Sequence, residues 1–198
     1  LTGSSQPTQL IRNNGAGSFS GVSTIFPELW GGATAWGDYD NDGDLDVYVA
    51  TWWAARNPFF TNNGNGTFSR VGVGHISTAT SYSESASWGD YDSDGDVDLI
   101  VCNSAVGLNN FLYRNDGGTF TKILTGPQVT DLNISFGASW ADYDNDLDLD
   151  LLVCNHGNQN EKLYRNDGGG VFTSVAGISV VTSNGYSIGS AWGDIDND

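Results

Sequence analysis

A nine-residue aspartate pattern recurs along this chain at a fixed interval and constrains its fold more than any other feature. Each complete copy places an aspartate at every second position, and successive copies begin 52 residues apart. Five carboxylates within nine residues repel one another unless the backbone curls around a cation that they share. The pattern therefore predicts an array of metal-binding loops on a repeating scaffold. The aspartates are Asp38, Asp40, Asp42, Asp44 and Asp46; Asp90, Asp92, Asp94, Asp96 and Asp98; Asp142, Asp144, Asp146, Asp148 and Asp150; and, in a shortened fourth copy, Asp194, Asp196 and Asp198.

The negative charge of the chain is concentrated in these loops. The formal net charge is −17, and eighteen of the 24 acidic residues belong to the four copies. Only seven Lys and Arg residues are present, and they are scattered singly, which excludes a nucleic-acid-binding surface. No window approaches 18 apolar residues, so no membrane insertion is predicted. The chain starts at Leu1 and contains no Met, and we expect it to be a mature product or a segment of a longer one.

The segments between the loops predict β-strands. Each repeat holds four short apolar runs: one ends in Trp-Gly or Trp-Ala before the aspartates, one follows them, and two flank a glycine turn. Asn-Gly and Asp-Gly pairs at Asn14, Asn63, Asp116 and Asp167 are typical of hairpin turns. No stretch of ten residues has helical periodicity. The predicted fold is an all-β propeller of four-stranded blades with a 52-residue repeat.

The repeat also predicts the domain organisation, a single propeller domain or fragment over residues 1–198. Residues 1–24 supply half a blade, residues 33–72, 85–124 and 137–175 supply full blades, and residues 189–198 begin another. Three full blades do not close a ring. We therefore expect a larger propeller, for example of seven blades, or half-blades that pair with a neighbouring molecule. Cys102 and Cys154 occupy equivalent repeat positions, too far apart for the ~5.5–6 Å Cα separation of a disulfide, and are predicted to be free thiols.

Two motifs carry a resemblance to a known family. The sequence WGDYDNDGDLDV at 36–47, together with LYRNDGGTF at 112–120, resembles the FG-GAP/VCBS repeats of the integrin α-subunit propeller and of many secreted proteins. The resemblance implies a propeller, often seven-bladed, with calcium in the loop between the first two strands of each blade. The chain departs from the family pattern at Leu147, which stands where the other loops have glycine.

Calcium takes six to eight oxygen ligands, and the alternating aspartates suit it. We expect the first, third, fifth and ninth loop positions to bind through side chains and the seventh, at Asp44, Asp96 and Asp148, through its backbone carbonyl. Gly43 and Gly95 occupy a sixth position that needs a positive φ. Leu147 adopts that conformation only at a cost of ~1–2 kcal/mol, so the third site is predicted to be weaker.

Other kinds of metal site fit the loops less well. An EF-hand needs a glutamate at position 12 and flanking helices, but Val49, Val101 and Val153 stand there. Magnesium keeps several waters and rarely uses an all-protein cage. A metal ringed by carboxylates on a rigid hairpin has no open position for a substrate, so the predicted calcium is structural and not catalytic.

Aromatic residues fall into two groups. Trp36, Trp88, Trp140 and Trp192 stand beside each loop, which favours packing between blades over ligand binding. Trp52 and Trp53, with Arg56 nearby, interrupt the repeat on the face opposite the loops. They suit either contact with a protein or glycan or packing under a loop. His75 and His156 are interpreted as surface histidines, and Asn65 and Asn133 begin glycosylation sequons.

The chain contains no nucleophile motif, phosphate loop or open metal site, so it is predicted not to be an enzyme. The leading hypothesis is a calcium-binding extracellular module, secreted or at the cell surface, that engages protein or glycan in adhesion. Extracellular calcium modules bind calcium with dissociation constants of ~10⁻⁴–10⁻³ M, so the calcium concentration of the cytosol would leave such sites empty. One alternative is a subunit of an extracellular filament or matrix that assembles head to tail through its half-blades. Another is a targeting domain attached to an enzyme.

Overall fold

The structure, a computed structural model, describes residues 10–22, 32–52, 55–72, 74–182 and 184–194. Three antiparallel four-stranded sheets dominate it, each formed from one stretch of the chain. The first contains β3 (Thr34–Gly37), β4 (Asp46–Val49), β6 (Phe59–Asn62) and β7 (Phe68–Arg70). The second contains β9 (Ser83–Gly89), β10 (Asp98–Asn103), β11 (Phe111–Asp116) and β12 (Thr119–Ile123). The third contains β13 (Ser135–Ala141), β14 (Asp150–Asn155), β15 (Lys162–Asn166) and β16 (Phe172–Val175).

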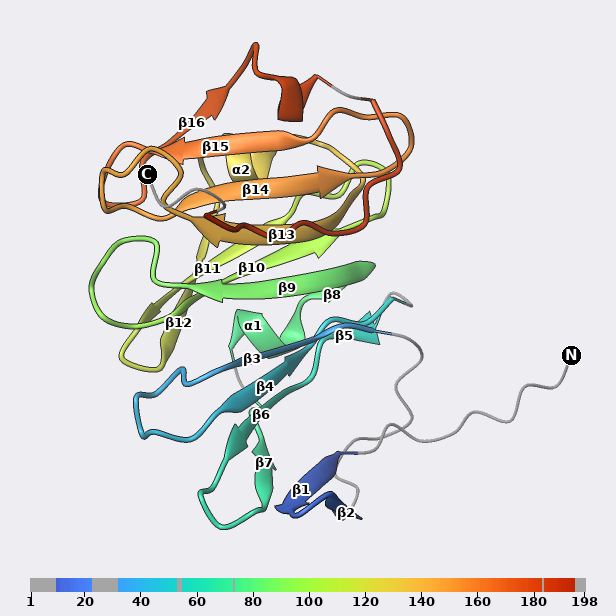
Figure 1. Ribbon diagram of the computed structural model, residues 1–198, viewed down its shortest axis with the longest axis vertical. Coiled ribbons are helices and arrows are strands. Elements are labelled where there is room, and N and C mark those ends of the chain that lie inside the picture. Colours follow the sequence, from blue (N-terminus) through green and yellow to red (C-terminus); the bar gives the residue numbers. More distant parts are fainter. Residues whose placement is uncertain (1–9, 23–31, 53–54, 73, 183, 195–198) are drawn as a thin grey trace, which may run out of the picture.

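The three sheets stack face to face in chain order (Figure 1), and their first strands β3, β9 and β13 lie next to one another. Every connection between a first and a second strand is an aspartate loop, and all three loops lie on the same side, at the left of Figure 1. The all-β fold with repeated, propeller-like blades is therefore confirmed. We name the three sheets, in chain order, blades 1, 2 and 3.

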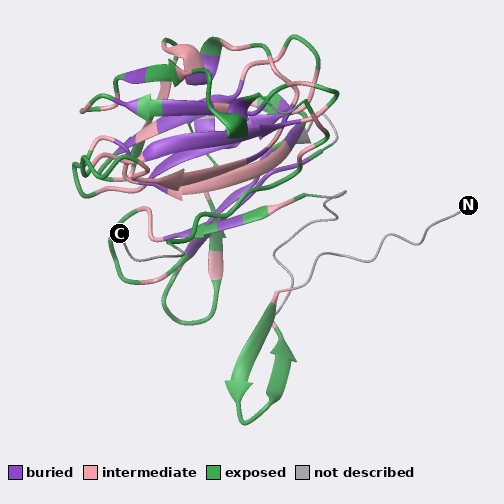
Figure 2. Cartoon of the chain, turned by 45° about the horizontal axis from the view of Figure 1, so that its top comes forward, coloured by how far each residue is buried: buried purple, intermediate pink, exposed green. Residues whose placement is uncertain are grey.

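Smaller elements flank the blades. A hairpin of β1 (Ile11–Gly15) and β2 (Ser18–Gly21) precedes blade 1, and Figure 2 shows that its residues are exposed. Leu10, just before β1, packs against the apolar face of blade 1. The two-residue strands β5 (Ala55–Arg56) and β8 (Thr80–Ser81) pair with each other. Helical turns are limited to α1 (His75–Thr78), α2 (Pro127–Thr130) and the 3₁₀ turn η1 (Ser179–Val181), and no helix in the described residues is long and apolar enough to cross a membrane.

The segment after η1 runs beside β13 without regular pairing. The Ser187 N–H donates to the Asn155 carbonyl at 3.1 Å, and the Ser139 and Ser190 hydroxyls lie 2.6 Å apart. Residues 189–198 were expected to begin another blade, but residues 189–194 form no strand. Among residues 184–194 the β pairing is a single bridge between Gly185 and Gln159.

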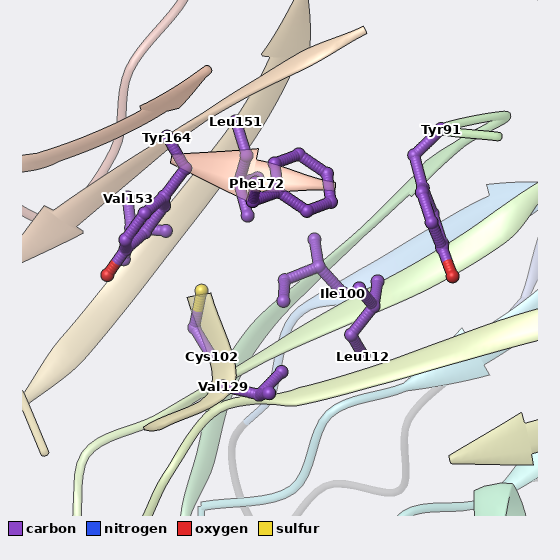
Figure 3. Close-up of a cluster of buried hydrophobic side chains, with 9 residues drawn as sticks. All are labelled: Tyr91, Ile100, Cys102, Leu112, Val129, Leu151, Val153, Tyr164 and Phe172. Carbon is purple, nitrogen blue, oxygen red and sulfur yellow. The ribbon is translucent and has the colours of Figure 1, made fainter. Parts of the chain in front are cut away.

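The core lies between blades, and the middle strands are buried on both faces. In β10, Leu99 and Val101 point into a cluster shared with blade 1, whereas Ile100 and Cys102 point into one shared with blade 3 (Figure 3). This arrangement explains why the sequence after each aspartate loop is a continuous apolar run and not an alternating one. Cys102 and Cys154 are both buried free thiols, which confirms that prediction.

Tryptophan and glycine interlock between neighbouring blades. A Cβ atom on Gly37 would lie 2.7 Å from the ring of Trp88, and one on Gly89 would lie 2.7 Å from the ring of Trp140. The Trp88-Gly89 pair of blade 2 thus provides a ring for blade 1 and a space for the ring of blade 3. Packing between blades is confirmed for Trp88 and Trp140. Trp36 and Trp192 are 41% and 39% exposed.

Candidate metal centre

The first, third and fifth aspartates of each loop converge on one point. In each loop, one carboxylate oxygen from each of the three lies within 4.8 Å of the others. The three clusters are Asp38, Asp40 and Asp42; Asp90, Asp92 and Asp94; and Asp142, Asp144 and Asp146. Because the loops are equivalent connections of stacked blades, the clusters form a row along one side of the molecule.

Backbone donors fix the first aspartate in each loop. In the second loop, the N–H groups of Asp94 and Gly95 donate to the two carboxylate oxygens of Asp90 at 3.1 and 3.0 Å. The other two loops repeat this pair of hydrogen bonds. The chain curls tightly enough for these bonds because the sixth position is left-handed. Gly43, Gly95 and Leu147 have φ values of 92°, 95° and 78°, as the sequence predicted for all three.

Leu147→Gly is expected to stabilise the protein. The left-handed conformation of a leucine costs about 1–2 kcal/mol, and the substitution removes this strain. Part of the gain is offset because glycine has greater conformational freedom in the unfolded chain. The side chain is 87% exposed, so no packing is lost. We expect a net gain of about 0.5–1 kcal/mol by denaturant unfolding. The reverse substitution Gly95→Leu serves as the matched control and should destabilise; a neutral or destabilising Leu147→Gly would contradict the strain.

The ninth aspartates are buried behind the clusters. Asp98 is fully buried; its two carboxylate oxygens accept the N–H groups of Tyr91 at 3.0 Å and Asn115 at 2.8 Å. Asp46 and Asp150 are held in the same way. Burial raises the pKa of Asp98 to about 7 and that of Asp46 to about 6, even though the backbone donors favour the ionised form. A nearby cation would favour ionisation of these groups.

The seventh aspartates connect each loop to neighbouring turns through their side chains. Asp96 accepts the Gly117 N–H at 2.7 Å and, from the preceding loop, the Asn41 side-chain amide at 2.6 Å. The Asp44 carboxylate lies against Gly64, where a Cβ would be 2.6 Å from its Oδ2. Use of the seventh backbone carbonyl as a metal ligand stays a prediction.

The clusters fit a hard divalent cation. Their donors are all carboxylate oxygens, the type that calcium prefers. In the second loop, Asp92 Oδ1 is buried without a hydrogen-bond partner among the described residues, so a cation there would satisfy it. Burial, followed by the neighbouring carboxylates, raises the pKa of Asp92. Of the fourth copy, Asp194 is described, whereas Asp196 and Asp198 lie outside the described residues.

A buried row of polar residues joins the blades at the opposite side from the loops, and sequence reasoning missed it. In blade 2, Asn110 accepts the Asn103 N–H at 3.0 Å and donates to Ser135 of blade 3 at 3.0 Å, and Ser135 donates to Asn155. The available signal was the 52-residue spacing of two sets of its members, Thr51, Asn103 and Asn155, and Ser83, Ser135 and Ser187. The row comprises Thr51, Asn57, Ser83, Asn103, Asn110, Ser135, Asn155, Glu161 and Ser187.

Aromatic side chains gather near this same side of the molecule. Trp52 is 50% exposed at the end of the first blade's second strand, and Arg56 lies exposed on β5. Trp53 falls outside the described residues. In blade 3 the His156 ring stacks on Phe136 at 4.6 Å and meets the edge of Tyr186 at 4.5 Å. Tyr186 is 62% exposed.

Fold and loops together define a repeat protein of propeller-like blades, each with an aspartate cluster that can hold a metal ion. A profile of the FG-GAP-like repeat matches residues 1–49, 38–101, 90–153 and 142–198, which together span the chain. The chain therefore belongs to the FG-GAP repeat family, whose members are typically non-catalytic interaction modules. A comparison with curated proteins found no match.

Proposed function

We propose that this chain is a calcium-binding extracellular module without catalytic activity, which engages a protein or glycan. The observation that carries the proposal is the row of three carboxylate clusters, built from the same three positions of each aspartate loop and placed at the same point of each blade. Magnesium suits these clusters less well because it retains most of its water.

Calcium in this arrangement acts on the fold. With a cation bound, carboxylates that otherwise repel become ligands, and the first and second strands of each blade are clamped together. The weak affinity typical of extracellular modules, about 10⁻⁴–10⁻³ M, would suit millimolar extracellular calcium. This reasoning supports a secreted or cell-surface location.

Partner binding is assigned to the side opposite the loops. Trp52, Tyr82 and Tyr186 are 50%, 44% and 62% exposed there. Exposed aromatic rings supply contact area at little entropic cost and stack on protein or sugar surfaces. On a glycan array and on cells, Trp52→Ala and Tyr186→Ala should reduce binding. Leu147→Ser, which changes an exposed side chain on the loop side, should not; the opposite pattern would move the contact to the loop side.

The calcium assignment is tested by isothermal titration of the metal-free protein. We expect binding at the three complete loops, with the third loop weakest. The triple variant Asp38→Asn, Asp90→Asn and Asp142→Asn keeps the shape of the loops but removes one charge from each, and should lose most of the binding. A wild type that takes up no calcium, or a triple variant that binds as the wild type does, would contradict the proposal.

A further inference from the structure

Asn115 lies between the first two aspartate loops and is bonded to both. Its side-chain amide donates to the Tyr39 carbonyl of the first loop at 2.7 Å and to the Val97 carbonyl of the second at 3.1 Å. Its backbone N–H donates to the buried Asp98 carboxylate at 2.8 Å. Asn115 itself is fully buried.

Asn166 repeats this arrangement between the second and third loops. Its amide donates to the Tyr91 carbonyl at 2.7 Å and to the Leu149 carbonyl at 3.3 Å, and its N–H donates to Asp150 at 2.8 Å. It is also fully buried. The three loops are therefore linked in series, each pair by one asparagine from the third strand of the later blade.

Asn62, the equivalent residue of blade 1, provides an internal contrast. It bonds to its own loop, at the Leu45 carbonyl and the Asp46 carboxylate, and to its own turn, at the Gly64 N–H. No bond to a preceding aspartate loop exists for it among the described residues. Asn62 thus shares the local role of Asn115 without the bond across blades.

A second bond joins the first two loops at the surface. The Asn41 amide donates to Asp96 at 2.6 Å. The residue that corresponds to Asn41 in the second loop is Ser93, with a φ of 60° against 58° for Asn41. Serine is therefore compatible with this backbone conformation, and a substitution of Asn41 by serine can break the bond without adding strain.

We propose that Asn115 and Asn166 are positioning residues that couple the loops, so that calcium in one loop favours calcium in the next. The proposal rests on the proposed function. Tyr39 stands between Asp38 and Asp40 of the first cluster, so a cation that fixes these two carboxylates also restricts the movement of the Tyr39 carbonyl between them. A closed first loop accepts the Asn115 amide, which fixes the asparagine that also holds Val97 and Asp98 of the second loop. By linkage, the second loop acts equally on the first.

The test is a calcium titration in an Asp142→Asn background. This change disables the third loop and leaves the two loops that have glycine at the sixth position. The quantity to measure is the ratio of the second to the first stepwise binding constant. We expect the ratio to fall about five- to tenfold in Asn115→Ala. Asn62→Ala, which removes the equivalent local bonds, should leave it unchanged.

Asn41→Ser adds a variant that leaves the core intact, and Asn145→Ser, in the disabled loop, is its matched control because Asn145 has a φ of 60°. Asn41→Ser should lower the ratio and Asn145→Ser should not. If Asn115→Ala and Asn41→Ser both have the same ratio as the background protein, the coupling is overturned, whereas the proposed function is not. Absence of calcium binding to the wild type overturns the proposed function and the coupling with it.

Discussion

Removal of calcium should lower the midpoint of thermal unfolding by roughly 10–30 °C. A ligand that binds only the folded state stabilises it by about 2.7 kcal/mol when its concentration is one hundred times the dissociation constant. For a chain of this size, each kcal/mol corresponds to roughly 2–4 °C. At 10 mM, calcium stands at about 10 to 100 times dissociation constants of ~10⁻⁴–10⁻³ M, so three filled loops together supply about 4–8 kcal/mol.

The measurement is a calorimetric scan in 10 mM calcium and again in EGTA at matched ionic strength. Asp90→Ala, in the middle loop, should reproduce part of the loss even with calcium present. Asp116→Ala is the matched control: it removes the same charge from an exposed residue that is paired with Arg114 outside the loops. Equal midpoints in calcium and EGTA would show that the metal does not hold the blades.

Trp140→Ala should cost about 2–3 kcal/mol of the free energy of unfolding, below or at the low end of the range for a fully buried aromatic residue because the ring is partly buried. The Trp140 ring stacks on Tyr91 with an interplanar angle of 12° and fills the space above Gly89, and its Nε1 donates to the Ser87 carbonyl at 3.3 Å. Its removal leaves a cavity at the contact between blades 2 and 3.

Trp36→Ala is the matched control for this substitution. Trp36 has the same position in blade 1, but it is 41% exposed and meets the Phe68 ring edge-on at 6.2 Å. We expect it to lose less than half as much stability in urea unfolding followed by fluorescence and circular dichroism. Equal losses for the two variants would mean that tryptophan packing between blades is not the main source of the Trp140 effect.

The blades and the metal clusters were predictable from sequence because their causes are local. Alternating aspartates have few other stable uses, and a 52-residue period with hairpin turns leaves few architectures open. The left-handed Leu147 was predictable for the same reason: the aspartates around it determine the loop, whichever residue stands at the sixth position.

The hydrogen bonds between blades, unlike the tryptophan packing, were not predictable from the sequence. The sequence marked Asn115 and Asn166 only as members of a recurrent third-strand motif, because their partners Tyr39 and Tyr91 lie about one and a half repeats earlier. Likewise, the ninth aspartates were expected only as ligands. Their hydrogen bonds to the third strand became visible once the sheet had brought that strand next to the loop.

The polar row shows the same limit. Ser83 and Ser135 are unremarkable in sequence, yet each completes a buried hydrogen-bond chain between two blades. Their spacing was available, but a serine in a strand has many roles, and only its neighbours determine which it plays. The irregular course of residues 184–194 also depends on such scattered bonds and not on the repeat.

The most direct test of the calcium assignment is diffraction from crystals grown in millimolar calcium, with anomalous data collected at a long wavelength. We predict an anomalous peak inside each of the three carboxylate clusters, at the calcium–oxygen distance of about 2.3–2.6 Å from the first, third and fifth aspartates. The third peak should be the weakest at limiting calcium. Ordered loops without anomalous density at any cluster would contradict the account.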